Sequence, residues 1–203
     1  THFAPQLAKS LLLAARRGLR LPIVYNTNAY DSVDVLKLLD GIVDVYLPDL
    51  KYSDDEAGRE YSKVTEYTRH SRAAIREMFR QMGDALEYDE NGLLKRGLII
   101  RLLVLPNDIA GIRESLCWIR DQLSPRVAVS LMAQYFPTNR VGLDRYPLIS
   151  RKIRWSEWVA AVDQLESLGM EEGWMQDFDS AADYYRPDFG VAKVVGQRLT
   201  EKT

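Results

Sequence analysis

Short apolar segments alternate with stretches of helical apolar spacing along this chain, and that alternation limits the folds open to it. The apolar segments are rich in Val, Ile and Leu, as buried strands are, and they span residues 19–26, 42–47, 98–105 and 127–131. A helical pattern follows each of them. Since a crossover of this length joins parallel strands, the order predicts right-handed βαβ units and the α/β class, with about four parallel strands.

The helical stretches are recognised by apolar residues that recur three and four positions apart. The first covers residues 5–15, and the apolar stripes of the others are Val35, Leu36 and Leu39; Ile75, Met78, Phe79 and Met82; Ile112, Leu116, Ile119 and Leu123; and Trp158, Val162, Leu165 and Leu168. Asp31 or Ser32 is expected to cap the second helix, and Ser156 the last. A small β-hairpin is predicted at residues 86–94, with Asn91-Gly92 in its turn.

About four strands are too few for an eight-stranded barrel, whereas a barrel that lacks its first βα units would give this number. An open flavodoxin-like sheet is the alternative architecture. The chain opens on Thr1 and enters a helix almost at once, which favours a fragment of a longer polypeptide. Residues 1–203 are expected to form a single domain, with residues 190–203 as a frayed tail.

The amino-acid composition indicates the class of protein and the compartment in which it is expected. The hydrophobic fraction of 46% and the charged fraction of 28% are typical of a soluble globular protein. A net charge of −2 gives no electrostatic reason to expect nucleic acid or an anionic membrane surface. No apolar run approaches the length of a membrane span. The single cysteine, Cys117, excludes an internal disulfide framework, so a cytoplasmic location is expected.

Polar side chains stand at or near the ends of the predicted strands. They are Asn26, Thr27 and Asn28 after the first strand, Asp49 and Lys51 after the second, Arg101 inside the third, and Gln134 and Tyr135 after the fourth. If the strands are parallel neighbours, these groups converge on one rim of the sheet. One carboxylate and two cations beside hydrogen-bonding groups suit a zwitterionic or carboxylate-bearing ligand. Two plainer interpretations remain: Asp49 and Lys51 as an exposed surface pair, and Arg101 as a structural partner of Asp49.

Several common chemistries lack their motifs. The chain has neither the glycine-rich dinucleotide turn nor the phosphate loop, and it has no serine nucleophile elbow. The two histidines, His2 and His70, have no zinc-ligand partners at metal spacing. Asp89 and Glu90 belong to a turn and lack the spacing of a calcium loop. Cys117 is expected to fill space in a helix.

Four segments resemble the later strands of pyruvate formate-lyase activating enzymes and, more closely, the uncharacterised radical S-adenosylmethionine (SAM) proteins related to them. The segments occur in the family's order, and they are Tyr25-Asn26-Thr27-Asn28-Ala29-Tyr30, Leu47-Pro48-Asp49-Leu50-Lys51, Arg101-Leu102-Leu103-Val104-Leu105-Pro106 and Leu131-Met132-Ala133-Gln134-Tyr135. Thr1-His2 resembles the end of the family's Gly-Gly-x-x-Thr segment. The resemblance covers residues 1–189.

The resemblance implies a partial TIM-like (β/α)6 barrel that lacks its first βα units. It implies a radical SAM enzyme, which cleaves SAM reductively with a 4Fe-4S cluster and generates a 5′-deoxyadenosyl radical. The cofactor-binding residues that it implies are Asn26, Thr27, Asn28, Asp49, Lys51 and Arg101. An electron donor such as flavodoxin or ferredoxin is the implied partner. For a protein substrate, the loop 138–153 and the aromatic tail 174–189 would be docking surfaces.

Three departures from the family pattern limit the resemblance. Asn26 stands where activating enzymes commonly carry Asp, and Phe136 where they often carry His, which argues against pyruvate formate-lyase activation specifically and leaves a glycyl-radical activating enzyme as one of the functions that the resemblance implies. The cysteine triplet that holds the cluster is absent, and Cys117 alone cannot replace it. The chain by itself is therefore expected to be inactive, with the cysteines on an upstream segment.

Two alternatives to a radical SAM enzyme remain open. Lys51 at a strand end could be the Schiff-base lysine of an aldolase-like barrel. The chain could also be a cluster-free, non-catalytic interaction module that binds a partner through its aromatic tail.

Overall fold

A computed structural model of the 203-residue chain describes residues 3–138, 141–142 and 144–181. Its centre is a sheet of five parallel strands in chain order: β1 (Val24–Thr27), β2 (Val45–Pro48), β4 (Leu94–Leu103), β5 (Ala128–Met132) and β6 (Gly173–Met175). β3 (Glu87–Tyr88) pairs antiparallel with β4 and makes the predicted hairpin. The parallel α/β class is confirmed. The expected strand number was too low because β6 is only three residues long and lies in an aromatic segment without a periodic pattern.

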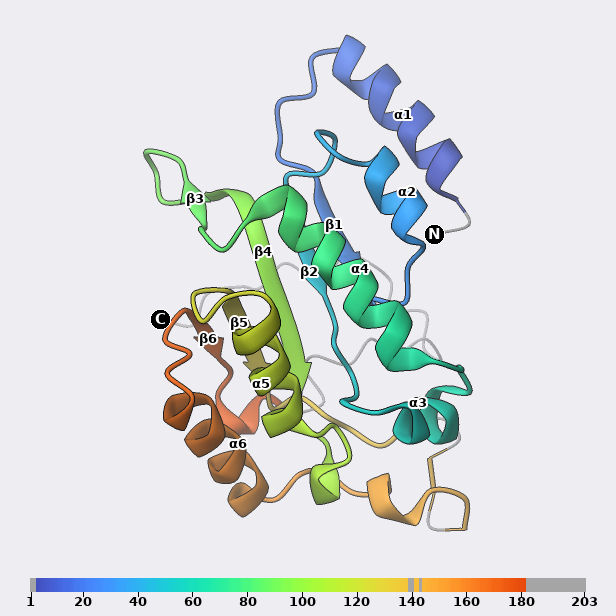
Figure 1. Ribbon diagram of the computed structural model, residues 1–203, viewed down its shortest axis with the longest axis vertical. Coiled ribbons are helices and arrows are strands. Elements are labelled where there is room, and N and C mark those ends of the chain that lie inside the picture. The colour runs from blue at the N-terminus through green and yellow to red at the C-terminus, as the bar shows by residue number, and fades with distance from the viewer. Residues whose placement is uncertain (1–2, 139–140, 143, 182–203) are drawn as a thin grey trace, which may run out of the picture.

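The helices that follow the strands lie on one face of this sheet, as Figure 1 shows for α4 and α5 in front of β2, β4 and β5. The helices are α1 (Ala4–Arg16), α2 (Val33–Leu38), α3 (Asp55–Ser62), α4 (Tyr67–Met82), α5 (Ile112–Gln122) and α6 (Trp155–Ser167). Three short 3-10 turns complete the described elements, η1 (Pro106–Asp108), η2 (Pro147–Ile149) and η3 (Phe178–Ala181). Of these helices, α3 was not predicted, because its polar sequence reads as a loop.

The strand order shows no reversal along the sheet. A doubly wound fold such as flavodoxin reverses its strand order at a switch point and places helices on both faces. In the described part of this chain, neighbouring parallel strands are also consecutive parallel strands, and their crossover helices share one face. The described sheet is therefore singly wound, unlike a flavodoxin-like sheet. The described sheet is open, with β1 and β6 as its edges.

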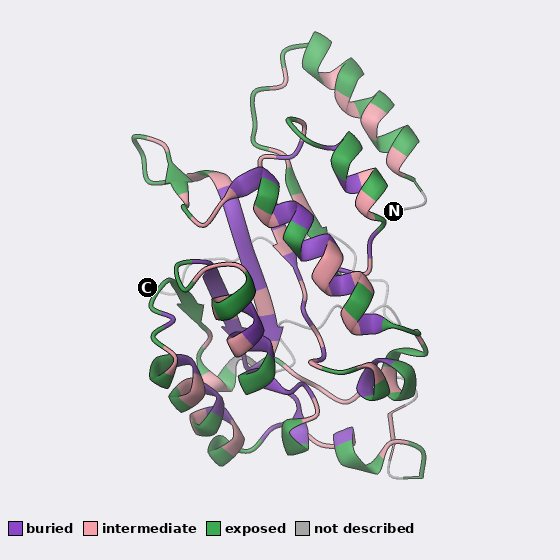
Figure 2. Cartoon of the chain, viewed as in Figure 1, coloured by how far each residue is buried: buried purple, intermediate pink, exposed green. Residues whose placement is uncertain are grey.

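The core lies between the sheet and the helical layer. β4 contributes Ile100 and Leu102 and β5 contributes Leu131, all fully buried, and α4 packs Ile75 and Met78 against them. Figure 2 shows the burial concentrated on β4, β5 and the facing sides of α4 and α5. The apolar stripe predicted for α4 is therefore confirmed as its core face.

Helix α1 differs from the others because none of its residues is buried. Leu7, Leu12 and Leu13 are 41%, 54% and 50% exposed, and Figure 2 shows the helix without buried surface. The edge strand β1, which follows α1 in the chain, is also open, since Val24 is 52% exposed. An amphipathic helix without buried residues and an open strand edge are both surfaces on which further secondary structure can pack.

Helix caps are where local prediction was least accurate. α6 begins at Trp155 and not after Ser156: Arg154 is its N-cap residue, and the Glu157 carboxylate accepts a 2.7 Å hydrogen bond from the Arg154 backbone N–H. Ser32 does occupy the N-cap of α2, but its side chain makes no capping bond. The Asp31 carboxylate instead accepts a short hydrogen bond from the Thr27 hydroxyl.

Two regions singled out from the sequence are described only in part. The loop 138–153 contains the short turn η2, but residues 139–140 and 143 lie outside the described residues. The aromatic tail is described to residue 181, so Tyr184 to Phe189 and the predicted frayed segment 190–203 also lie outside. Among the described helices, none has the length and apolarity that a membrane crossing needs.

Candidate functional site

Four of the predicted site residues meet in one cluster of charges at the carboxyl ends of three neighbouring strands. Arg101 Nη2 on β4 lies 2.6 Å from Asn26 Oδ1 on β1 and 2.6 Å from Asp49 Oδ1, just beyond β2. Lys51 Nζ donates a 2.9 Å hydrogen bond to Asp49 Oδ2. We call these residues, Asn26, Asp49, Lys51 and Arg101, the ion cluster. The suggested structural pairing of Arg101 with Asp49 is present, and it is one side of this larger arrangement.

Backbone hydrogen bonds set the position of the cluster. β2 ends at Pro48, beyond which the Asp49 N–H donates to Thr27 O on one side, at 2.8 Å, and Leu50 N–H donates to Arg101 O on the other, at 3.0 Å. Lys51 N–H donates a 2.7 Å hydrogen bond to the hydroxyl of Tyr67, the first residue of α4. The segment 49–51 is therefore anchored to both neighbouring strands and to the helical layer.

The ion cluster is half-buried and does not satisfy all of its own polar atoms. The side chains of Asp49, Arg101 and Lys51 are 20%, 23% and 37% exposed. The Arg101 Nε atom is buried without an acceptor in the described structure, and Asp49 Oδ1 lies close to the guanidinium without the alignment of a hydrogen bond. Buried polar atoms in native proteins usually have partners, so an atom without one calls for an explanation such as a ligand.

The side chains of Thr27 and Asn28 bond within the turn after β1, and their role in cofactor binding stays a prediction. Thr27 Oγ1 donates to Asp31 and accepts from the Ala29 N–H, and Asn28 Oδ1 accepts from the Tyr30 N–H at 3.1 Å. These bonds shape the turn after β1, in which Ala29 adopts a φ of 61°. We therefore assign Thr27 and Asn28 to the turn that carries Asn26, and not to the ion cluster.

The register of the sheet extends the site to two residues that were not predicted. Asp49 is bridged to Arg101, Arg101 pairs with Ser130 on β5, and Ser130 pairs with Trp174 on β6. In-register residues of parallel strands share a face, here the face opposite the core residues Ile100 and Leu131. Trp174 is 49% exposed. We call Asp49, Arg101, Ser130 and Trp174 the cross-strand row.

No sequence signal identified the second half of this row. Ser130 lies inside an apolar strand, and Trp174 lies in a strand too short to show alternation. The register of β6 on β5 alone places the indole beside the charges. At roughly 4.8 Å per strand, Trp174 stands two strands, or about 10 Å, from Arg101.

Gln134 and Tyr135, expected on the same rim, are held by other contacts. Gln176 Nε2 donates to Gln134 Oε1 at 3.1 Å, which links the segments after β5 and β6. The Tyr135 hydroxyl donates to Ile149 O at 2.7 Å and fixes the loop 138–153 to the end of β5. Both residues organise the rim without joining the ion cluster.

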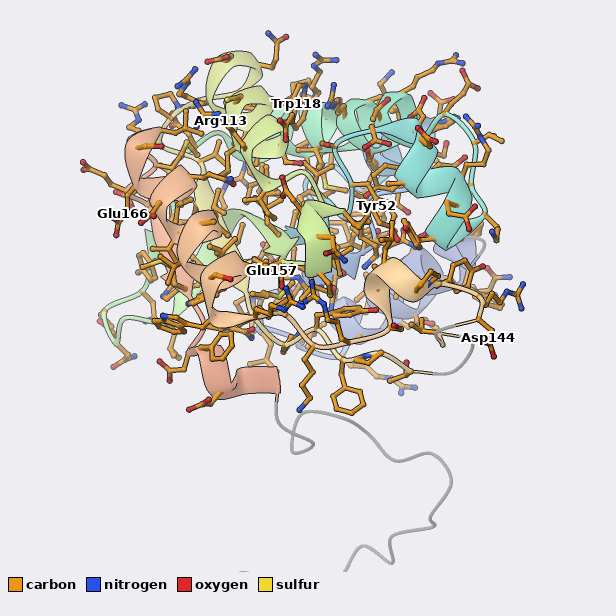
Figure 3. The ribbon with its side chains drawn as sticks, turned by 90° about the horizontal axis from the view of Figure 1, so that it is seen from below. Tyr52, Arg113, Trp118, Asp144, Glu157 and Glu166 are labelled. Carbon is orange, nitrogen blue, oxygen red and sulfur yellow. The ribbon has the colours of Figure 1, made fainter. Side chains whose placement is uncertain are left out.

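Tyrosines around the cluster stay neutral near pH 7. Burial raises the pKa of Tyr67 and of Tyr52, and it raises the pKa of Tyr135 to about 12. Figure 3 looks onto the carboxyl end of the sheet and labels Tyr52 there. Since these phenols carry no charge, two cations and one carboxylate define the charge of the ion cluster.

The described residues offer no site for a metal ion or metal cluster. No group of three or more His, Cys, Asp or Glu side chains in this part of the chain is arranged to hold a metal. Cys117 is on α5, in the helical layer, and the ion cluster is on the other face of the sheet. The thiolates that an iron–sulfur cluster needs are therefore not supplied here.

A comparison with models of protein families finds no match for this chain. An uncharacterized protein of Methanocaldococcus jannaschii is similar to it, with 28% identity over 167 residues. The similar region is 82% of this chain and 44% of that protein, so the chain matches less than half the length of this relative. The name of this relative states no activity.

Proposed function

We propose that this chain is the C-terminal part of a radical SAM enzyme, and that the ion cluster and the cross-strand row bind SAM. The observation that carries the proposal is the meeting of Asn26, Asp49, Lys51 and Arg101 at the carboxyl ends of adjacent parallel strands. Ligands of parallel α/β folds bind at that end of the sheet.

The chemistry of the row matches the two ends of SAM. The amino acid end is a zwitterion, for which Arg101 and Lys51 offer cations and Asp49 and Asn26 offer acceptors. The other end is a planar adenine, for which the half-exposed indole of Trp174 offers a stacking face. The unpartnered Arg101 Nε supports a ligand acceptor in this position.

The iron–sulfur cluster does not fit this chain's own residues, so its ligands belong to another part of the intact protein under this proposal. The sheet winding without reversal supports a partial barrel, and the exposed edge at β1 with the unburied α1 supports packing of upstream βα units there. In the intact enzyme, SAM and the cluster would supply the radical that abstracts hydrogen from a substrate. The residues of the cross-strand row would bind and orient SAM.

Binding of SAM to this chain is the direct test of the site. Isothermal titration of the 203-residue protein with SAM should show a single saturable site, weaker in Arg101→Gln and in Trp174→Leu. Trp155→Leu is the matched control, because Trp155 is similarly exposed, at 61%, but belongs to α6 and packs its ring against Phe178, outside the row. Equal affinity in all four proteins would remove the site assignment.

The enzyme assignment needs the longer polypeptide. Under this proposal, the coding sequence upstream of Thr1 contains a Cys-x-x-x-Cys-x-x-Cys segment, and the intact protein cleaves SAM after anaerobic reconstitution with iron and sulfide. A missing triplet, or no cleavage by a protein with a full cluster, would contradict the assignment. In that event the non-catalytic interaction module is the better interpretation.

The alternative of a Schiff-base lysine gains no support from the surroundings of Lys51. Such lysines are activated by desolvation in an apolar pocket or by a neighbouring cation. The Lys51 side chain is 37% exposed and donates to the Asp49 carboxylate. Borohydride trapping with a carbonyl substrate is expected to add no mass at Lys51.

A further inference from the structure

A second polar hollow lies on the outside of the helical layer, between α4 and α5. It encloses about 580 Å³ and is lined on the α4 side by Arg69, Arg72 and Arg76, and on the α5 side by Cys117, Trp118 and Asp121. Figure 3 shows Trp118 where α5 faces α4, so the hollow belongs to the side of the molecule away from the ion cluster. Nothing in the proposed SAM site uses these residues.

Arginines on α4 sit over the indole of Trp118. The guanidinium carbons of Arg72 and Arg76 lie 5.4 and 5.6 Å from the ring centre, within the range of cation–π interactions. The indole is 7% exposed, so the two guanidinium groups form the accessible floor of the hollow. Their stacking holds two positive groups side by side without a carboxylate between them.

Two hydrogen-bond donors at this place are buried without acceptors in the described structure, Arg72 Nε and Trp118 Nε1. The Arg72 Nη2 atom is satisfied by Ser53 O at 3.0 Å, and Arg76 Nη2 donates to Gln122 Oε1 at 3.2 Å. Burying a donor without a partner costs free energy. The unmet groups are all donors, which points to an acceptor-rich ligand.

The charges around the hollow also favour an anionic ligand. Arg69 is paired with Glu66 at 2.7 Å, and Asp121 is paired with Arg120 at 2.7 Å, so these two pairs cancel. Arg72 and Arg76 have no ion-pair partner among the described residues, and Asp55, a carboxylate whose charge acts on Arg72, accepts hydrogen bonds from Thr68. Burial, with the charge of Arg76, lowers the pKa of Arg72 even though the charge of Asp55 acts in the opposite direction.

We propose that the hollow between α4 and α5 binds the phosphate group of a small phosphorylated ligand through Arg72 and Arg76. A phosphate is a compact acceptor that accepts several N–H bonds at once, and arginine recognises it by its planar fork of donors. The volume of the hollow exceeds that of a phosphate alone, so the ligand carries a further small group. An acidic peptide is the competing ligand, but two guanidinium groups side by side over one indole suit a single compact acceptor better than carboxylates spaced along a peptide.

The chain carries its own reporter for this site, because its single cysteine, Cys117, lines the hollow. Its rate of reaction with 4,4′-dithiodipyridine, a neutral disulfide, measures access to the hollow. Its rate with 5,5′-dithiobis(2-nitrobenzoate), an anionic disulfide, also measures the local positive potential. Pyrophosphate is the probe ligand, titrated at constant ionic strength.

Pyrophosphate is expected to slow both reactions several-fold in a saturable manner, with a midpoint that moves to higher concentration in Arg72→Gln and Arg76→Gln. Arg113→Gln is the matched control, since Arg113 lies five residues before Trp118, on another side of the same helix, and Figure 3 places the two apart. Both substitutions in the hollow should also lower the rate of the anionic reagent relative to the neutral one.

Three outcomes would overturn the proposal. One is the absence of protection in the unmodified protein. Another is an equal loss of protection in Arg113→Gln, which would show general charge screening. The third is protection by a short polyglutamate peptide but not by pyrophosphate, which would assign the hollow to acidic peptides. Arg76→Gln keeps the test valid if Arg72→Gln folds poorly, because the one hydrogen bond given for the Arg76 side chain, to Gln122, is exposed.

Discussion

The guanidinium of Arg101 and the carboxylate of Asp49 join β4 to the end of β2, with 2.6 Å between Arg101 Nη2 and Asp49 Oδ1. The same Nη2 atom reaches Asn26 on β1. One side chain therefore connects the carboxyl ends of three strands. The Arg101 side chain holds the strand ends together, as a structural clamp does. Charged and amide groups of this kind also bind cofactors, and Arg101 Nε is unpaired, so the same residues also fit a preformed ligand site.

Substitutions of Arg101 and Asp49 measure the structural contribution of this pair. Arg101→Gln leaves Asp49 with Lys51 as its remaining cation, and we expect a loss of about 1–3 kcal/mol in the free energy of unfolding. Urea unfolding of Arg101→Gln, Asp49→Asn and the double variant gives the coupling energy, expected at about 0.5–3 kcal/mol. A coupling of zero would mean that the pair contributes nothing to the joint between β2 and β4.

A second ion pair, Arg151 with Glu157, should make stability depend on acid. The Arg151 guanidinium, which donates to both carboxylate oxygens at 2.7 and 2.8 Å, lowers the pKa of Glu157 to about 2 from its ordinary 4.5. Glu157 also accepts from the Asn107 and Arg154 N–H groups, and it lies where η1 meets α6 (Figure 3). The carboxylate thus joins three segments.

Since the folded pKa of Glu157 is below the unfolded one, its stabilisation is fully present above about pH 4.5 and is lost as the pH falls toward 2. Allowing for solvent screening of a partly exposed pair, we expect a contribution of about 1–2 kcal/mol. Glu157→Gln should lose that amount at pH 7 and lose less on acidification than the unmodified protein. Parallel stability curves from pH 7 to pH 2.5 would show that Glu157 is not the group responsible.

The sequence was most informative where periodicity is strong. The stripe of Ile75 and Met78, the hairpin turn at Asn91-Gly92 and the apolar strands lie where they were expected, because each follows from local spacing or turn chemistry. The joining of Asn26, Asp49 and Arg101 also followed from parallel strand ends meeting at one edge. These features depend on residues that are close together in the sequence or on the parallel direction of the strands.

What the sequence did not reveal depends on register and on local competition for hydrogen bonds. Trp174 enters the cross-strand row only through the pairing of a three-residue strand, which no periodic pattern announces. The hydrogen bond from the Thr27 hydroxyl to Asp31, which shapes the turn after β1, was also not foreseen. Ser156 looked like a cap, but the Glu157 carboxylate on the next residue occupies the Arg154 N–H.

Helix α1 should contribute little to the stability of this chain alone. Its residues are all at least partly exposed, so deletion of residues 1–16 removes little buried apolar surface. We expect the free energy of unfolding to fall by less than about 1 kcal/mol, measured by urea unfolding. In a longer polypeptide that carries upstream βα units, Leu12→Asp should destabilise much more than in the 203-residue chain. An equal effect in both would argue that α1 is a surface helix in the intact protein too.

The pairing of β6 with β5 should depend on the absence of a side chain at position 173. Gly173 has a φ of 129°, and a Cβ atom there would lie 1.9 Å from Val129 O and 2.7 Å from Val129 N. Because the obstacle is backbone, it cannot move aside as a flexible side chain would, and Gly173→Ala should cost about 1–3 kcal/mol. Gly142→Ala is the control, since a Cβ atom at Gly142 meets nothing within 4 Å.

Hydrogen exchange of the Val129 N–H, which donates to Glu172 O, should accelerate in Gly173→Ala and stay unchanged in Gly142→Ala. Displacement of β6 also moves Trp174 out of the cross-strand row, so SAM affinity should fall in Gly173→Ala while the Arg101–Asp49 coupling energy is retained.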